Sequence, residues 1–266
     1  MMQGYHNGTI NKALCECYIP VYWTEIQISK RYDDALITKE KTPDNDYIWD
    51  LWHLLHDLPD DRPYFTVVQH DDGIMISSMP DHLITFAMGG SGNIPIPLTY
   101  DENLAIEKYK NVEKTTFCSF VGSLTHPCRE KMVEVMKDKP DVYIATNEWT
   151  NQIKEDKQTL YLEIISKSRF TLAPRGYGKT SFRLYEALRF GSIPVYVYDY
   201  PWLPYQERLD WSRMAVLVHM DDLASLYERL CNISDDEVAA MLEYYKTHSH
   251  LFSYDGMCEY ILSNFT

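Results

Sequence analysis

Short apolar runs alternate along most of the chain with segments in which apolar residues recur every three or four positions. The runs are rich in β-branched and aromatic residues and end at glycine, proline or aspartate, which is typical of buried strands. The sequence predicts strands at 17–23, 64–69, 82–88, 116–121, 143–145, 170–172, 193–198 and 214–219, and helices at 46–57, 129–135, 160–165, 181–190, 223–230 and 234–246. This alternation predicts an α/β fold in which helices cover both faces of parallel sheets.

The chain is long enough for two small Rossmann-like domains, each with its own core. We expect the N-terminal domain at 1–105, on the acceptor side, and the C-terminal domain at 106–247, on the donor side. The tail at 248–266 carries several apolar and aromatic residues, and we expect it to form a helix that packs back towards the N-terminal domain.

The stretch 168–204 combines a strand, a loop with glycines, a short helix and a second strand. Pro174, Gly176 and Gly178 exclude regular structure after the first strand. Thr180 or Ser181 can cap the helix, which is expected to end at a left-handed glycine. A helix start of this kind presents free N–H groups to an anion, so a phosphate suits it. An ordinary strand-to-helix connection would have the same spacing.

Basic side chains gather in this stretch although the chain as a whole is acidic. Arg175 and Lys179 lie in the glycine loop, and Arg183 lies at the start of the helix. Glu186 follows Arg183 by three positions and so lies on the same helix face, where its carboxylate suits a pair of sugar hydroxyls. A phosphate clamp beside an acceptor for a diol indicates a nucleotide.

The same stretch resembles the exostosin family of inverting glycosyltransferases. The matching positions are Ser168, Phe170, Leu172, Pro174, Gly176, Ser181, Arg183, Glu186, Ala187, Gly191, Pro194, Val195, Leu203 and Pro204. The resemblance implies a GT-B fold, with two Rossmann-like domains facing across a cleft and the sugar-nucleotide site in the C-terminal one. The nucleotide-binding residues expected there are Gly122, Ser123, Arg129, Arg175, Tyr177, Ser181, Phe182, Arg183 and Glu186.

A strand end in the N-terminal half carries candidates for a catalytic base. His70, Asp71 and Asp72 follow the strand at 64–69 and precede Gly73. Ligands bind at this edge of an open α/β sheet, and an acceptor hydroxyl needs a base as the nucleotide leaves. Asp71 or Asp72 would serve, with His70 as the weaker base; alternatively both aspartates only cap the turn. The exostosin family has a related His-Asp-aromatic-Gly element, in which Asp72 here replaces the aromatic residue.

Asp44 and Asp46 form a DxD pair of the kind that holds a metal ion in GT-A glycosyltransferases. The pair precedes a helix rather than ending a strand, so helix capping explains it better. Arginines and helix N-termini can stabilise a departing diphosphate without a cation. We therefore expect no metal ion and no other cofactor.

Composition argues against several other classes. The formal net charge of −14, without a basic stripe, disfavours a nucleic-acid partner. No apolar run reaches the roughly twenty residues of a membrane-spanning helix, and no signal peptide is recognisable. The six cysteines, among them Cys15 and Cys17, form no CxxC pair, which favours free thiols. We expect a cytoplasmic protein, in the host cell if it is viral, unless an N-terminal anchor was removed.

The predicted reaction is an inverting, metal-independent transfer of a sugar from a UDP donor to a hydroxyl of a glycan acceptor. The compact length resembles that of the short exostosin-like xylosyltransferases of large algal viruses, which makes UDP-xylose the first choice of donor. The resemblance leaves UDP-galactose, UDP-arabinose, UDP-glucuronate and UDP-N-acetylglucosamine open as other donors. Two other classes fit the same residues. One is a catalytically inert glycan-binding protein of the same fold, and the other is a nucleotide-sugar hydrolase or phosphorylase.

Overall fold

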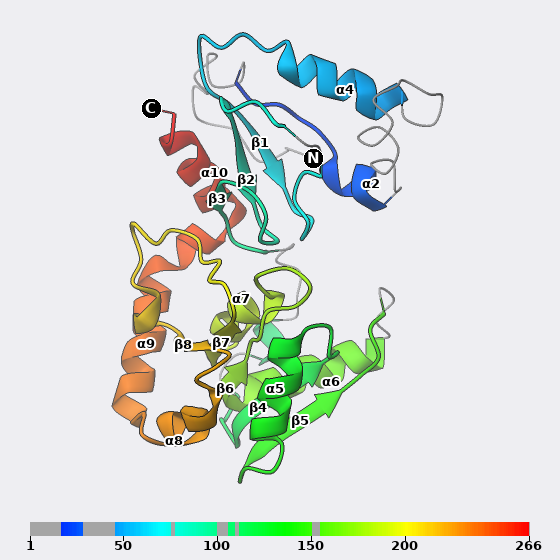
Figure 1. The fold of residues 1–266 in the computed structure, drawn as a ribbon. Helices are drawn as coiled ribbons and strands as arrows, with labels where there is room; N and C mark the ends of the chain where they lie inside the picture. Colours follow the sequence, from blue (N-terminus) through cyan, green and yellow to red (C-terminus); the bar gives the residue numbers. More distant parts are fainter. Residues whose placement is uncertain are drawn as a thin grey trace. The chain divides into compact units, whose positions relative to one another are not determined.

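The computed structural model describes residues 17–28, 46–75, 78–99, 106–109, 112–150 and 155–265 (Figure 1). The chain divides into two compact α/β units. One comprises Met1–Pro95 and Cys258–Thr266, and the other comprises Ile96–Met257. Asp44 of the DxD pair and Cys15 lie outside the described residues.

The first unit is built on a parallel sheet in the order β1-β2-β3. Its strands are β1 (Tyr64–Val68), β2 (Leu83–Ala87) and β3 (Ile94–Pro95), and its helices are α2 (Trp23–Ile28) and α4 (Asp46–His56). α4 was predicted from its helical spacing, and its buried side chains Ile48, Leu51 and Leu55 share a core with Trp23 and Val68. The last helix, α10 (Tyr254–Ser263), carries residues of this unit from Cys258 onwards.

The strand predicted at 17–23 is wrong. The chain makes a single parallel bridge there, between Tyr18 and Phe65, and then enters α2 at Trp23. Trp23 and Ile26 are both buried and lie three positions apart, which puts them on one face of a helix. Trp23 also donates its indole N–H to Thr66 Oγ1 at 2.7 Å, which satisfies its polar group inside the core.

The second unit contains a five-stranded parallel sheet in the order β5-β4-β6-β7-β8. Its strands are β4 (Thr116–Gly122), β5 (Val142–Thr146), β6 (Ser168–Leu172), β7 (Ile193–Tyr198) and β8 (Val216–His219). Its longer helices are α5 (Pro127–Met136), α6 (Glu155–Lys167), α7 (Phe182–Arg189), α8 (Leu226–Cys231) and α9 (Asp235–His248), with short 3₁₀ turns η1 (Ile106–Tyr109), η2 (Trp211–Arg213), η3 (Leu223–Ser225) and η4 (Ser249–Phe252). The predicted helix at 223–230 is therefore a 3₁₀ turn followed by α8.

Helices cover both faces of this second sheet (Figure 1). On one face, Met132 of α5 and Leu226 of α8 pack on Phe120 and Val195 of the sheet. On the other, Ile165 of α6 and Ala187 of α7 share a separate cluster with Tyr109. Two parallel sheets with helices around them confirm the predicted α/β class and are consistent with a GT-B-type fold.

Local signals explain where several helices begin and end. Ser181 caps α7 by accepting from the backbone N–H of Arg183, and Gly191 beyond its end has φ +66°. Ser234 and Glu237 form the predicted capping box of α9, with Glu237 N–H donating to Ser234 Oγ at 3.2 Å. None of the helices in the described part of the chain is long and apolar enough to span a membrane.

Candidate functional site

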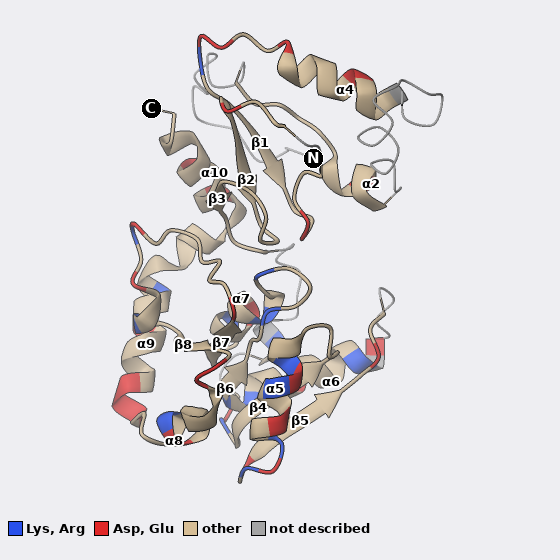
Figure 2. Ribbon diagram, viewed as in Figure 1, with Lys and Arg blue, Asp and Glu red and all other residues tan. Residues whose placement is uncertain are grey.

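Several residues of the candidate site follow strands of the second sheet. Ser123 follows β4, Arg175 and Tyr177 follow β6, and Asp199 follows β7. Because the strands are parallel, their carboxyl ends meet at one edge of the sheet, where α/β proteins bind ligands. Figure 2 shows acidic and basic positions interspersed over the described helices of this unit, so these elements carry no continuous basic stripe of the kind that follows a nucleic acid.

Arg183 is held over the end of β4. Its Nε and Nη2 donate to the carbonyl oxygen of Val121 at 2.9 and 2.6 Å, and its guanidinium carbon lies 5.4 Å from the centre of the Phe120 ring. A Cβ on Gly122 would lie 2.4 Å from Nη2 of Arg183. A side chain at position 122 would therefore displace the guanidinium from this place.

Arg129 fastens two loops at the same edge. It lies on α5 and is 7% exposed, and its Nη1 and Nε donate to the carbonyl oxygens of Ser123 and Arg175 at 2.8 and 3.0 Å. A Cβ on Gly176 would lie 2.7 Å from its Nη2. The absence of a side chain at Gly176 therefore leaves room for the Arg129 guanidinium, as Gly122 does for that of Arg183.

Arg175 is paired with a carboxylate that the sequence analysis did not single out. Its Nη1 donates to Oδ1 of Asp199 at 2.7 Å, and its Nη2 donates to the carbonyl oxygen of Tyr177 at 2.8 Å. Burial acts to raise the pKa of Asp199, but the hydrogen bond and charge of Arg175 outweigh it and lower that pKa. Strands β6 and β7 are neighbours in the sheet and end beside each other, which brings Asp199 to Arg175.

Glu186 is 8% exposed and accepts a hydrogen bond at Oε2 from the hydroxyl of Tyr161 on α6. The ring of Tyr161 also lies under the Arg183 guanidinium, with 5.6 Å between guanidinium carbon and ring centre. Tyr161 thus joins the acid and the arginine, a role that the sequence left open. Phe182 and Tyr177 are more exposed, at 36% and 62%.

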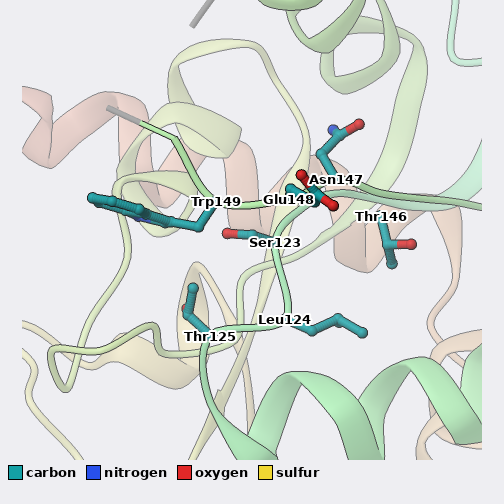
Figure 3. Close-up of a pocket in the computed structure, with 7 residues that line it drawn as sticks. All are labelled: Ser123, Leu124, Thr125, Thr146, Asn147, Glu148 and Trp149. Atoms are coloured by element: carbon teal, nitrogen blue, oxygen red, sulfur yellow. The ribbon is translucent and has the colours of Figure 1, made fainter. Parts of the chain in front are cut away.

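A cavity of about 390 Å³ opens beside this cluster (Figure 3). It is lined by residues that follow two strands, Ser123, Leu124 and Thr125 after β4 and Thr146, Asn147, Glu148 and Trp149 at the end of β5. The indole of Trp149 is 71% exposed and offers a flat aromatic face. Hydroxyl, amide and carboxylate groups around an aromatic face suit the stacking and hydrogen bonding of a nucleobase.

The predicted base candidates lie in the first unit, just beyond β1. Asp72 Oδ2 accepts from Gln27 Nε2 at 3.0 Å and lies 3.7 Å from Nδ1 of His70. The backbone N–H of Asp72 donates to the same His70 nitrogen at 3.2 Å. Gln27 was not predictable as a partner of Asp72, because it lies on α2, far from Asp72 along the chain.

The loops after β1 and β2 pack closely on each other at the carboxyl edge of the first sheet. A Cβ on Gly89 would lie 2.5 Å from Cα of Asp71, and a Cβ on Gly73 would lie 2.3 Å from the carbonyl oxygen of Ser91. Gly73 also has φ +70°, a region that favours glycine. Two glycines therefore let the loop after β2 approach the turn that carries Asp71.

Three potential metal ligands that were not predicted come together in the second unit. The donor atoms of His126, Cys128 and Asp199 lie within 4.8 Å of one another. Burial raises the pKa of the Cys128 thiol to about 11, and burial and Arg175 lower the pKa of His126. His126 Nδ1 accepts from the Cys128 N–H at 3.2 Å, which places the ring proton on Nε2, 3.7 Å from Asp199.

Comparisons with known proteins place these residues in a family. The model of the exostosin GT47 domain matches residues 53–233, which include the base candidates from His70 onwards and the whole arginine cluster. The Exostosin-1 homolog of Caenorhabditis elegans is 39% identical over 83 residues, or 31% of this chain and 22% of that protein. Probable glucuronosyltransferase 47 A of Physcomitrium patens is 31% identical over 117 residues, or 44% and 24%.

The chain spans about a quarter of the length of these curated relatives. Among solved structures, an α1,3-fucosyltransferase aligns with 48% of this chain and 37% of its own, at 21% identity and a TM-score of 0.33. The match at 53–233 covers more than half of the sequence. The protein therefore belongs to the exostosin GT47 domain family of glycosyltransferases.

Proposed function

We propose that this protein is an inverting glycosyltransferase that moves a sugar from a UDP donor to a hydroxyl of a glycan acceptor, without a metal ion. The observation that carries the proposal is the cluster of Arg129, Arg175 and Arg183 at the carboxyl edge of the second sheet, beside a cavity that suits a nucleobase. Three guanidinium groups in a chain of net charge −14 favour an anionic ligand at this place.

Each part of a uridine diphosphate has a counterpart there. The cavity offers the indole of Trp149 to the base, and the Glu186 carboxylate, oriented by Tyr161, offers an acceptor to ribose hydroxyls. The arginines would balance the charge that develops on the diphosphate as the bond to the sugar breaks. The charge of Arg175 is already partly balanced by Asp199, and the Arg183 guanidinium lies at the end of β4.

The proposed base is Asp71 or Asp72 of the first unit. It would take the proton of the acceptor hydroxyl while that oxygen attacks the anomeric carbon and UDP leaves, so the configuration inverts. Asp72 is oriented by Gln27, and Asp71 by the backbone that packs on Gly89. In the GT-B arrangement expected from the sequence, this base acts on a donor held by the second unit.

The donor sugar expected from the resemblance is xylose, whereas several relatives are named probable glucuronosyltransferases. UDP-xylose and UDP-glucuronate are therefore the first two donors to compare. They differ by one carboxylate on the sugar ring, which makes them a matched pair.

A panel of UDP sugars tests the proposal by thermal shift and by turnover with glycan acceptors, with and without EDTA. We expect at least one UDP sugar to raise the melting temperature, and Arg183→Ala to abolish that shift. If no UDP sugar stabilises the protein, the proposed assignment of the donor site is wrong. Turnover that EDTA abolishes would overturn the metal-independent mechanism. UDP release that needs no acceptor would indicate a hydrolase. A protein that binds glycans but no UDP sugar would be a glycan-binding protein.

A further inference from the structure

Four side chains with potential metal-binding atoms meet at the carboxyl edge of the second sheet. His126 and Cys128 lie at the start of α5, Asp199 follows β7 and Met220 follows β8. The donor atoms of His126, Cys128 and Asp199 lie within 4.8 Å of one another, and Sγ of Cys128 lies 3.6 Å from Sδ of Met220. The four residues come from three connections that are far apart along the chain, so the fold brings them together.

The spacing of these atoms fits a small tetrahedral cation. Bonds of about 2.0–2.3 Å to a tetrahedral ion put neighbouring ligand atoms roughly 3.3–3.8 Å apart. Oδ2 of Asp199 lies 3.7 Å from Nε2 of His126, and the sulfur atoms of Cys128 and Met220 lie 3.6 Å apart. Two edges of a tetrahedron are therefore present, and shifts of about 1 Å bring the other atoms of the set into range.

Outer contacts orient the carboxylate of this set. Oδ1 of Asp199 accepts from Nη1 of Arg175 and from the backbone N–H of Tyr200, both at 2.7 Å, while Oδ2 is the oxygen nearer His126. Carboxylates that bind metal ions are held by hydrogen bonds of this kind. Cys128 is fully buried and the Asp199 side chain is 35% exposed, so a cation reaches the cluster from the side of Asp199.

The donor set favours a thiophilic cation over a hard one. Thiolate and thioether sulfur are ligands for Zn²⁺, Cd²⁺ and Cu⁺, whereas Mg²⁺ and Ca²⁺ take oxygen ligands. The charged neighbours that act on His126 and Cys128, besides Asp199, are Arg175, Arg129, Lys131 and Glu130. Three of these four are positive and oppose an ion held by charge alone. A cation here therefore depends on its bond to sulfur.

We propose that His126, Cys128, Asp199 and Met220 bind one thiophilic divalent cation, of the class of Zn²⁺ and Cd²⁺, which fastens three connections at this edge of the sheet. Cys128 gives its thiol proton to solvent and binds as the thiolate. The His126 ring keeps its single proton on the nitrogen that does not bind the cation. The bond to the cation replaces the hydrogen bond from the Cys128 N–H to Nδ1 of His126. The cation takes no step in the proposed sugar transfer.

Titration of the chelator-treated protein with Zn²⁺, Cd²⁺ and Co²⁺, without nucleotide, tests this site. We expect Zn²⁺ to raise the melting temperature and Co²⁺ to give the absorption of thiolate-to-cobalt charge transfer, while Mg²⁺ and Ca²⁺ do neither. Cys128→Ser should abolish that absorption. Cys128→Ser, His126→Gln and Asp199→Asn should each weaken Zn²⁺ binding at least tenfold to hundredfold, and Met220→Leu should weaken it less. Cys231→Ser is the control, since this free cysteine is exposed on α8.

Three results would overturn the site. The first is a wild-type protein that binds neither Zn²⁺ nor Cd²⁺, and the second is a Co²⁺ complex without thiolate charge transfer. The third is Zn²⁺ affinity that His126→Gln and Asp199→Asn leave unchanged, which places the ion elsewhere. These two side chains are partly exposed, so their variants decide the question even if the buried Cys128→Ser does not fold. UDP sugars test the proposed function separately, so either proposal can fail while the other stands.

Discussion

Nη2 of Arg183 occupies the space that a side chain on Gly122 would need, with 2.4 Å between that atom and a Cβ built on the glycine. Gly122→Ala must therefore displace the guanidinium from its two hydrogen bonds to Val121. If Arg183 binds the diphosphate, UDP affinity should fall roughly tenfold to a hundredfold, equivalent to about 1.5–3 kcal/mol. Isothermal titration with UDP measures the loss.

A double-mutant cycle shows whether this loss passes through the arginine. In an Arg183→Ala background the clash is absent, so Gly122→Ala should then change UDP affinity little. Additive effects of the two substitutions would mean that the glycine acts by another route, such as distortion of the turn after β4.

Much of the stretch 168–204 was predictable because its signals are local. The Ser181 cap, the left-handed Gly191 and the strand Ile193–Tyr198 each depend on residues within a few positions. The partners of the site residues were not predictable, because they come from distant elements. Asp199 reaches Arg175 only because β6 and β7 are neighbours in the sheet, and Tyr161 reaches Glu186 from a different helix.

The same limit explains the error at 17–23. An apolar run of seven residues fits a strand or a buried helix equally well, and packing decides between them. Here Trp23 has a hydrogen-bond partner in Thr66 and Ile26 has a place in the core, both from the face of a short helix. Neither contact is visible in the spacing of the residues around them.

The ion pair of Asp199 with Arg175 predicts a pH dependence of stability. Because the folded pKa of Asp199 is lowered, its contribution is present above the ordinary Asp range, about pH 4, and is lost as the pH falls through the folded pKa. Asp199→Asn should lower the free energy of unfolding by on the order of 1 kcal/mol at pH 7, and by less towards pH 2. Urea unfolding over this range measures it.

Asp221→Asn provides the control for that measurement. Asp221 is 69% exposed and lies 3.5 Å from Lys131, so its loss should change stability little at any pH. If the difference in the free energy of unfolding between wild type and Asp199→Asn is as large at pH 2 as at pH 7, the substitution acts through packing rather than charge.

The Glu186 carboxylate predicts a preference for ribose over deoxyribose. If it accepts from ribose hydroxyls, wild-type protein should bind UDP better than 2′-deoxy-UDP or 3′-deoxy-UDP, and Glu186→Gln should lower that preference by roughly tenfold or more. Tyr161→Phe should have a smaller effect in the same direction, because it removes only the hydrogen bond that orients the carboxylate. Glu163→Gln on α6 is the control and should leave the preference unchanged.

Trp149 predicts where the base binds. Loss of base stacking costs about 1–3 kcal/mol, so Trp149→Ala should weaken UDP binding by that amount and leave the binding of pyrophosphate unaltered. Tyr143→Ala removes another exposed ring, 41% accessible on β5 but outside the lining of the cavity, and should change neither affinity. If Trp149→Ala weakens the binding of UDP and of pyrophosphate equally, the indole does not stack on the base.

The pair Asp71 and Asp72 predicts a separation of binding from chemistry. Asparagine at the true base should lower kcat by roughly 10²–10⁴ and leave UDP affinity unchanged, because a general base acts only on the acceptor hydroxyl. Asparagine at the other position should cost less than about tenfold, since it removes a turn contact. If Asp72 is the base, Gln27→Ala should lower kcat partly, because it removes the donor that orients Oδ2 of Asp72. If Asp71 is the base, Gln27→Ala should leave kcat unchanged. Full activity in both asparagine variants would move the base to His70 or to a residue outside this turn.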